Sequence, residues 1–300
     1  MDTTKIYLSK ATFGHASYAA FRPTYPKALY DTVLAFHHGK NNVCLDLGCG
    51  HGLVARELSS HFDTTIGIDP SKGMIETAEK LTPKDRYPST TYRVSTSESL
   101  PFISDASVDL VVAGQAAHWF DFPSLFKELN RIVRPGGTLA FWGYKDHAFV
   151  DYPVATKILD EYTYSLSPDK LGSYWPQPGR SIVQNKLRAI KPDEYGWGDV
   201  QRVEYEPDSE GRGIAEGEGT MFMNRRCTIG ASKSYCRTWS CYHGWLEAHP
   251  DRRPKEEGGK GDIMNEVMEK IAQQVPEFAD DGFEVEIEWG SGLVMARKPA

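Results

Sequence analysis

Apolar and polar positions in the first half of the chain alternate between two patterns. Between apolar runs, residues 53–60, 71–80 and 124–132 carry apolar side chains at helical spacing, and Ser71 is a natural N-cap for the second of these predicted helices. Five short runs rich in β-branched residues predict buried strands at 42–47, 64–69, 91–94, 108–113 and 138–142. Strands that alternate with helices in this way predict a parallel sheet with helices on both faces.

The pattern changes after about residue 144, where the chain becomes rich in aromatic residues and is punctuated by proline and glycine. Strand-like runs return only at 200–205 and 283–297, and we expect both to rejoin the sheet. The intervening stretches, 152–195 and 227–275, predict a helical cap over the carboxyl edge of the sheet. The polar, glycine-containing stretch 251–261 predicts a surface loop, and so does 206–219.

Together these patterns predict a doubly wound α/β fold with a seven-stranded, mostly parallel sheet and an inserted helical cap. Residues 1–38 are expected to form a helical lid segment, 39–150 the α/β core, and 151–300 the cap insertions with the strands that complete the sheet. A chain of this size buries a core large enough to fold without cross-links. The five cysteines are odd in number and form no CxxC pair, which predicts plain thiols and no metal site.

Charge narrows the class of partner. The 34 basic and 41 acidic residues give a formal charge of -7, and no basic run stands out, so we expect no nucleic acid partner. Residues 1–10 lack the apolar run of a signal peptide, and no stretch approaches the roughly 20 apolar residues of a membrane span. A cytoplasmic monomer or homodimer that acts on a small molecule, with no membrane partner, is therefore expected.

The strongest chemical signal is a buried strand that ends in a glycine-rich turn and opens a helix, at residues 43–52. Gly48, Gly50 and Gly52 allow positive φ and close approach of the backbone to a ligand. A dinucleotide fingerprint requires a third small residue at position 53, where Leu53 stands, so a nicotinamide enzyme is disfavoured. Asp46 precedes the turn and is suited either to accept hydrogen bonds from a cationic amino-acid ligand or to order the loop. S-adenosylmethionine, with its ammonium and sulfonium groups, fits that requirement.

Further pieces follow in order along the chain. Asp69 closes the second strand about 20 residues beyond the turn, where an acidic residue meets ribose hydroxyls in doubly wound nucleoside sites, although a helix cap aided by Pro70 is an alternative. The segment 96–102 follows the third strand, where this architecture holds an adenine, and a polar turn would look similar. The fourth strand ends near Gln115, and Arg134-Pro135-Gly136-Gly137 turns the chain into the fifth.

In this order and spacing, residues 40–143 resemble the class I S-adenosylmethionine-dependent methyltransferases. The resemblance implies an enzyme whose cofactor is S-adenosyl-L-methionine. The residues expected to bind it are Asp46, Gly48, Cys49, Gly50, Gly52, Asp69, Pro70, Met74, Thr96, Ser97, Glu98, Gln115 and His118.

Segments over nearly the whole chain resemble a narrower group, the fungal trans-aconitate methyltransferase family. They are RPTYP at 22–26, AHWFDF at 117–122, WGY at 142–144, DYP at 151–153, YWPQPGRS at 174–181 and RTWSCYHGW at 237–245. Members of that family methylate a carboxylate of small polycarboxylic acids or related compounds. The resemblance therefore implies an acidic small-molecule acceptor, whereas 202–226 matches none of the family's motifs.

These segments hold the side chains that a pocket for an organic anion requires. Arg22, Arg180 and Arg237 are candidates for charge-assisted hydrogen bonds to carboxylates, although each could be a surface arginine. The aromatic residues would supply flat apolar walls, or part of the core. The residues expected to contact substrate are Tyr18, Arg22, Tyr25, Trp119, Trp142, Tyr144, Tyr174, Trp175, Arg180, Arg237, Trp239, Tyr242 and His243.

Two histidines are candidate catalytic residues: His118, just past the fourth strand, and His243, in the cap. Either could instead be a structural histidine. An acceptor carboxylate is already ionised at neutral pH and needs no base, whereas a phenol would benefit from one. Two alternatives therefore remain: an O- or N-methyltransferase of a neutral secondary metabolite with a histidine base, and a catalytically silent binding protein with this fold.

Overall fold

The computed structural model describes residues 22–207 and 218–300, and these contain one nine-stranded sheet. Its strands are β1 (Val43–Leu47), β2 (Thr64–Asp69), β3 (Thr90–Val94), β4 (Val108–Gly114), β5 (Val133–Phe149), β6 (Gly198–Glu206), β7 (Glu218–Gly219), β8 (Asn224–Thr228) and β9 (Glu284–Arg297). They are arranged in the order β3-β2-β1-β4-β5-β9-β6-β7, with β8 paired to β9. The first five of these are parallel, and β9 runs antiparallel to both β5 and β6.

The seven expected strands are present as β1 to β6 and β9, so the predicted fold class is confirmed. The short strands β7 and β8 enlarge the sheet beyond that expectation. The predicted cap stretch 227–275 was wrong at its start, because Cys227 and Thr228 pair with β9 as part of β8. The fifth strand also runs on to Phe149 rather than ending at 142, since β9 continues beside it and pairs His147 with Trp289 and Phe149 with Ile287.

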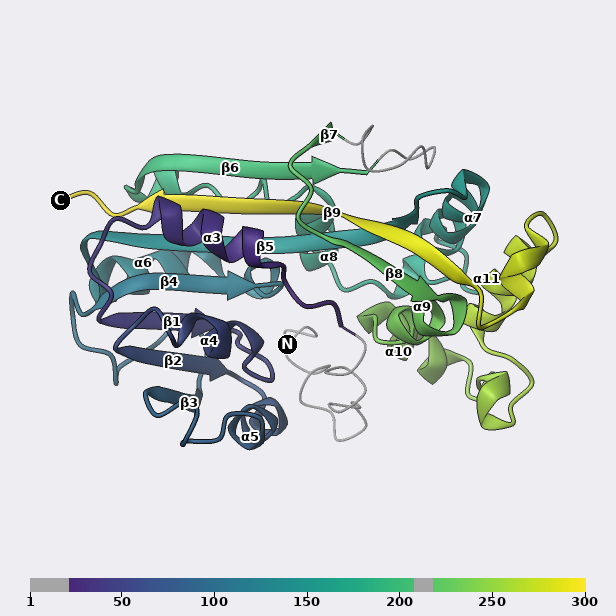
Figure 1. Cartoon of the computed structure of the whole chain (residues 1–300), viewed down its shortest axis with the longest axis horizontal. Coiled ribbons are helices and arrows are strands. Elements are labelled where there is room, and N and C mark those ends of the chain that lie inside the picture. The colour runs from purple at the N-terminus through teal and green to yellow at the C-terminus, as the bar shows by residue number, and fades with distance from the viewer. Residues whose placement is uncertain (1–21, 208–217) are drawn as a thin grey trace.

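Helices cover both faces of the sheet, as a doubly wound fold requires. On the face toward the viewer in Figure 1, helices α3 and α4 bury Val33 and Leu58 against Leu110 of β4. On the opposite face, α6 buries Phe126 and Leu129. The helices are α3 (Lys27–Phe36), α4 (Leu53–Leu58), α5 (Lys72–Lys80), α6 (Phe122–Ile132), α7 (Pro153–Tyr164), α8 (Gly179–Gln184), α9 (Ile229–Cys236), α10 (Ser240–Ala248) and α11 (Ile263–Ala272).

Local chemistry explains where several helices begin. The Ser71 hydroxyl accepts a hydrogen bond from the Met74 amide at 3.4 Å, so the predicted N-cap of α5 is confirmed. At the start of α11, Asp262 and Asn265 form a reciprocal capping box. Short 3₁₀ turns connect the longer elements: η1 (Ala117–Trp119), η2 (Gly172–Tyr174), η3 (Pro192–Tyr195), η5 (Lys255–Glu257) and η6 (Pro276–Ala279).

Helices α7, α9, α10 and α11 form the predicted cap beyond the carboxyl ends of the parallel strands (Figure 1). The long strands β5 and β9 reach into this cap and supply its core. Phe149 packs edge-on against Phe278 with ring centroids 5.1 Å apart, and Trp289 packs likewise against Tyr235 at 5.7 Å. The sheet and the cap are therefore joined by two continuous strands.

The described part of the N-terminal segment, residues 22–38, contains α3, whose Leu29, Tyr30, Val33 and Phe36 are buried in the sheet-facing core. The predicted lid extends over residues 1–21 as well, which lie outside the described residues, as do most of the predicted loop 206–219 and the expected substrate residue Tyr18.

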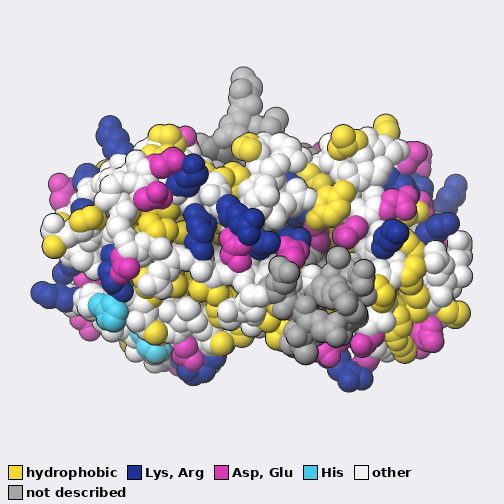
Figure 2. Space-filling model, turned by 90° about the horizontal axis from the view of Figure 1, so that it is seen from above, with side chains coloured by type: hydrophobic (Ala, Val, Ile, Leu, Met, Phe, Trp, Pro, Cys, Tyr) yellow, Lys and Arg dark blue, Asp and Glu magenta, His cyan; other side chains and the backbone are white. Residues whose placement is uncertain are grey.

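The surface carries charges of both signs. Lys and Arg side chains lie among Asp and Glu side chains on the face seen in Figure 2. Ion pairs at the surface include that of Arg188 with Glu204 on β6. Within the described ranges, no helix is long and apolar enough to span a bilayer.

Candidate active site

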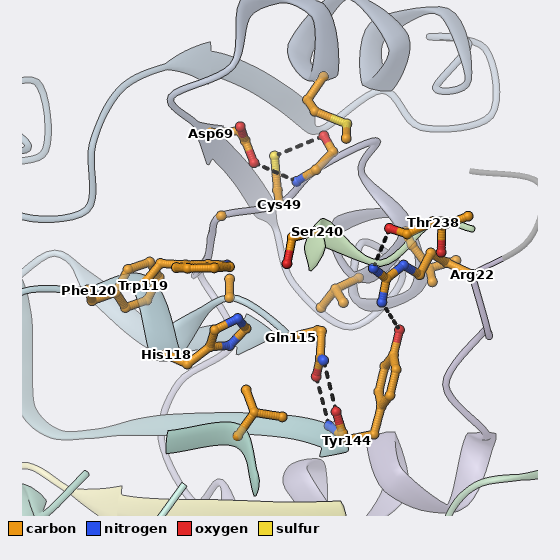
Figure 3. Close-up of a pocket in the computed structure, with 18 of the residues that line it drawn as sticks. Arg22, Cys49, Asp69, Gln115, His118, Trp119, Phe120, Tyr144, Thr238 and Ser240 are labelled. Carbon is orange, nitrogen blue, oxygen red and sulfur yellow. Dashed lines mark hydrogen bonds between the residues drawn. The ribbon is translucent and has the colours of Figure 1, made fainter. Parts of the chain in front are cut away.

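A pocket of about 240 Å³ lies between the carboxyl edge of the sheet and the cap. One end is formed by the turn after β1 and by Asp69 at the end of β2, and the other by residues 22–25 and the cap (Figure 3).

Backbone geometry explains the glycines of the turn after β1. Gly48, Gly50 and Gly52 have φ of +65°, +53° and +81°, a region that side chains other than glycine rarely adopt. A Cβ on Gly48 would lie 2.6 Å from the Ala116 Cβ, and one on Gly52 would lie 2.4 Å from the Tyr92 hydroxyl. On Gly50 it would meet no atom within 4 Å, so the backbone there faces open space beside the pocket.

Asp46 lies behind this turn and does not line the pocket. Its side chain is 1% exposed, and one carboxylate oxygen accepts a hydrogen bond from the Ala55 amide at 3.0 Å. Burial, followed by the nearby charge of Asp69, raises the pKa of Asp46 to about 8. The geometry therefore favours the loop-ordering role over direct contact with a ligand.

Asp69 lines the pocket and connects two of its loops. Its carboxylate accepts hydrogen bonds from the Gly50 amide at 3.0 Å and from the Ser71 amide at 2.8 Å. Burial raises its pKa, and these two hydrogen bonds oppose that shift. Because Ser71 caps α5, Asp69 does not serve as the helix cap, and the second lone pair on each oxygen is suited to accept from ribose hydroxyls.

Most residues expected to hold the cofactor line the pocket. They are Gly48, Cys49, Gly50, Asp69, Pro70, Met74, Thr96, Ser97, Glu98, Gln115 and His118. Of the remaining two, Asp46 lies behind the turn and Gly52 begins α4, held against Tyr92. The pocket lining also includes residues outside that expected set, which are His51, Leu53, Val54, Gly114, Ala116 and Phe120. The first three adjoin the glycines in the sequence, and the others lie close to Gln115 and His118, which was the available signal.

At the other end of the pocket, Arg22 and Tyr144 face the cavity together (Figure 3). The Arg22 guanidinium donates to the Tyr144 hydroxyl at 3.3 Å and to the Thr238 carbonyl at 3.0 Å. The side chain of Gln115 pairs with the backbone of Tyr144, accepting from its amide at 2.7 Å and donating to its carbonyl at 2.9 Å. Gln115 thus ties the end of β4 to β5 and fixes Tyr144.

A second arginine at this end is buried beside an acid. Arg180, 8% exposed, forms an ion pair with Asp146, 6% exposed, and both line the pocket. Its guanidinium also donates to the Tyr164 hydroxyl at 3.1 Å and lies 3.8 Å from the centre of the Trp175 ring. Burial raises the pKa of Asp146, but the charge and hydrogen bond of Arg180 outweigh this effect and hold the pKa below its usual range.

His118 is held in the neutral state. It is 9% exposed and lines the pocket, with its ring centroid 4.5 Å from that of Trp119. Burial, followed by the charges of Arg180 and Arg22, lowers its pKa to about 3. An imidazole with this pKa is too weak a base to take a proton efficiently at neutral pH.

Arg237 and Tyr242, both expected to contact substrate, lie in an ion network instead of the pocket. Arg237 donates to the buried carboxylate of Asp262 at 2.7 Å, and the Tyr242 hydroxyl donates to the same carboxylate at 2.6 Å. Glu256, in the segment predicted as a surface loop, accepts from Arg237 at 3.0 Å. These residues join α9, α10 and α11, so their role is to hold the cap together.

Three further residues expected at the substrate also lie outside the pocket. Trp142 is 2% exposed and packs edge-on against Tyr25 in the core. Tyr174 donates its hydroxyl to the Pro168 carbonyl at 2.9 Å. His243, the second candidate catalytic residue, is half-buried in α10, and burial followed by the charge of Arg22 lowers its pKa.

The remaining expected substrate residues do line the pocket, namely Arg22, Tyr25, Trp119, Tyr144, Trp175, Arg180 and Trp239. The lining also includes residues that the sequence reasoning missed, which are Pro23, Lys145, Asp146, Pro176, Val183, Tyr235, Thr238 and Ser240. Four of them lie within the family motifs quoted above, and Val183 and Tyr235 lie two residues from one, which was the signal for them. Lys145 and Asp146 follow the WGY motif, but the strand pattern ends at 142 and gave no reason to expect them in the pocket.

Comparison with known proteins defines the class. A model of the methyltransferase domain matches residues 45–141, the segment that begins within β1 and contains the glycine turn, β2, β3 and β4. Among solved structures, a candidate type II methyltransferase from Anaeromyxobacter dehalogenans aligns with a TM-score of 0.67 and 24% identity, over 93% of this chain and 99% of that one. Phosphoethanolamine N-methyltransferase 2 of Haemonchus contortus, in complex with S-adenosyl-L-methionine, aligns with a TM-score of 0.53 and 16% identity, over 100% of this chain and 61% of that one. The fold is that of the methyltransferases.

Relatives of full length show the family. A Saccharomyces cerevisiae protein, the probable S-adenosylmethionine-dependent methyltransferase CRG1, is 31% identical over 298 residues, covering 97% of this chain and 98% of its own. A candidate methyltransferase of Dictyostelium discoideum is 27% identical over 94% of this chain and 92% of its own. The chain belongs to the S-adenosylmethionine-dependent methyltransferases, and S-adenosyl-L-methionine is its cofactor.

The residues at the glycine end fit this cofactor. The open side of Gly50 leaves room beside the turn, and Asp69 offers carboxylate lone pairs at the same place. Thr96, Ser97 and Glu98 add polar groups where the adenine is expected, and Met74 adds an apolar one. These residues would hold the nucleoside at the sheet edge, with the rest of the pocket left for the acceptor.

Proposed function

We propose that this enzyme methylates a carboxylate oxygen of a small organic acid, in the class of trans-aconitate and related polycarboxylates. One observation carries the proposal: the acceptor end combines two arginines with a histidine whose pKa is about 3. Such an end is suited to hold an anion and is poorly suited to remove a proton. The resemblance to the trans-aconitate methyltransferase family supports the same class of acceptor.

The chemistry matches this division of the pocket. Bound S-adenosyl-L-methionine supplies an electrophilic methyl group together with its leaving group. A carboxylic acid with an ordinary pKa near 4 is ionised at neutral pH, so its oxygen is ready to attack without a base. The new bond joins that oxygen to the methyl carbon as the carbon–sulfur bond breaks, and the products are a methyl ester and S-adenosylhomocysteine.

The protein then has to bind and align the acid. Arg22 and Arg180 line the pocket and would orient an acceptor carboxylate, and Trp119, Trp175 and Trp239 would form the surrounding walls. Walls of this kind exclude water, which strengthens the interaction between arginine and carboxylate. Well-oriented reactants gain up to roughly 7 to 11 kcal/mol from effective molarity, so alignment is a sufficient source of rate.

The test is methyl transfer from labelled cofactor to pairs of molecules, each a di- or tricarboxylic acid and its amide, read by mass spectrometry. We expect a single added methyl on acids and none on amides. Arg22→Gln should lower kcat/KM at least tenfold, an order of magnitude typical of one charge-assisted hydrogen bond. Arg188→Gln, an exposed arginine paired with Glu204, is the matched control and should change nothing. Methylation of a neutral phenol at a rate that rises with pH would instead assign the neutral-metabolite alternative.

A further inference from the structure

Asp146, which no sequence motif indicates, forms a charged cluster with Arg180. Asp146 extends from the part of β5 beyond the sheet core, Arg180 belongs to α8, and Tyr164, at the end of α7, donates its hydroxyl to the same Asp146 carboxylate oxygen that Arg180 contacts. Both charged side chains are more than nine-tenths buried and both line the pocket. A buried ion pair gains little stability over apolar packing, so its position at the acceptor end points to a use.

The cluster also leaves donors available. Among the described residues, the Arg180 Nε has no hydrogen-bond partner although it is buried. A buried guanidinium nitrogen without a partner is costly and is typically satisfied by a ligand or water. Arg180 is therefore held rigidly by Asp146 and Trp175, with capacity left to bind an acceptor.

Positive side chains outnumber carboxylates at the acceptor end of the described lining, where Arg22, Lys145 and Arg180 lie with Asp146. The other carboxylates of this lining, Asp69 and Glu98, lie at the cofactor end. Lys145 is paired with Glu206, which lies outside the lining. Asp146 thus cancels one positive charge inside the pocket itself.

We propose that Asp146 is a specificity-determining residue. Because it neutralises Arg180, it limits the number of carboxylates that the preferred acceptor carries. This inference rests on the proposed function, because it concerns acidic acceptors. A unit charge removed from a site with an effective dielectric constant of about 20 changes the binding of another charge several ångström away on the order of tenfold or more. The charge of Asp146 is therefore large enough to set a preference between acids that differ by one carboxylate.

The experiment compares trans-aconitate with glutaconate, which lacks the middle carboxylate, in competition for the same enzyme. Asp146→Asn should raise the ratio of kcat/KM for the tricarboxylate over the dicarboxylate about tenfold, because Arg180 then keeps its full charge. Arg180→Gln should not raise the same ratio, because it removes the cation that would attract the extra carboxylate, while the buried Asp146, no longer paired, tends to take up a proton. The double variant removes both charges and should return the ratio toward the wild-type value.

Two controls separate charge from structural damage. Glu284→Gln removes the same charge from an exposed pair with Arg226 outside the pocket, and Tyr164→Phe loosens the cluster without changing its charge. Both should leave the ratio unchanged even where overall activity falls. Thermal melting reports whether each variant is folded, and Asp146→Ala, which also removes the negative charge, supplies the result if Asp146→Asn does not fold.

The outcomes are distinct. A rise of the ratio in Asp146→Asn that is absent from Arg180→Gln supports the inference. If the wild type forms methyl esters but the ratios do not move, or move in the same direction in both single variants, the role of Asp146 is overturned. The proposed function then remains intact. No methyl ester from any acid in the panel overturns the proposed function, and this inference with it.

Discussion

Asp46 offers a sharp test of how the cofactor turn is built. It is 1% exposed, it does not line the pocket, and its carboxylate accepts from the Ala55 amide at the start of α4 at 3.0 Å. Asp46→Ala removes that acceptor, whereas Asp46→Asn keeps an amide oxygen in its place. If Asp46 orders the turn, the alanine variant loses cofactor affinity and the asparagine variant retains most of it.

Two effects set the size of the expected change in stability. A buried Ala55 amide left without a partner costs about 1 to 3 kcal/mol in the alanine variant. The second effect is pH-dependent: the folded pKa of Asp46 is about 8, above its ordinary value of 3.8, because burial disfavours the charged form. The folded state therefore binds a proton that the unfolded state releases, so wild-type stability falls as pH rises from about 4 to about 8, by about 1 kcal/mol per pH unit. Asparagine carries no such proton and loses this dependence.

The assay is urea unfolding of the wild type and both variants between about pH 5 and pH 8, with calorimetric titration of the cofactor at each pH. The stability of Asp46→Asn relative to the wild type should increase steadily over this range. Asp31→Asn, an exposed acid paired with Lys27, is the control and should show no such trend. A constant difference between Asp46→Asn and the wild type, or loss of cofactor binding in both variants alike, would refute the reasoning.

Three other predictions follow from the site. Gly52→Ala should lower the free energy of unfolding in urea by about 2 kcal/mol or more, because its φ is +81° and the added Cβ meets the Tyr92 hydroxyl. Arg237→Met should lower the melting temperature by leaving the buried Asp262 carboxylate uncompensated, at a cost of about 3 to 5 kcal/mol, while KM for an acid stays the same in the folded fraction. Between about pH 5 and pH 8, the rate with an acid acceptor should show no titration step from His118, because the pKa of that histidine is about 3 and it stays neutral throughout. His118→Gln should therefore leave the shape of the pH–rate profile unchanged over this range.

The cofactor end could be predicted from sequence because its chemistry is local. The strand, the turn and the helix at residues 43–58 are contiguous, and only glycine satisfies the backbone at Gly48 and Gly52. Asp69 was predictable because strand order places the end of β2 beside that of β1. Asp46 shows the limit: its position in the motif was evident, but which way its carboxylate points depended on the Ala55 amide.

The acceptor end could be predicted only in part, because it is assembled from distant segments. Trp239 and Tyr242 belong to one motif, yet Trp239 lines the pocket and Tyr242 faces Asp262, a difference that depends on where the distant residue Asp262 lies. Arg180 was expected, but its partner Asp146 was not, because the strand pattern ends at 142 while β5 continues along β9. Apolar periodicity does not report such long-range pairing.

The central claim is that the turn from Gly48 to Gly50 and the carboxylate of Asp69 hold the nucleoside, with the reacting sulfur directed toward Arg22 and Arg180. A crystal structure with S-adenosylhomocysteine tests it most directly. The account predicts ribose hydroxyls on Asp69 and the sulfur facing the side of the pocket lined by His118 and Trp119. Nucleoside bound elsewhere, or a sulfur directed away from the arginines, would contradict it.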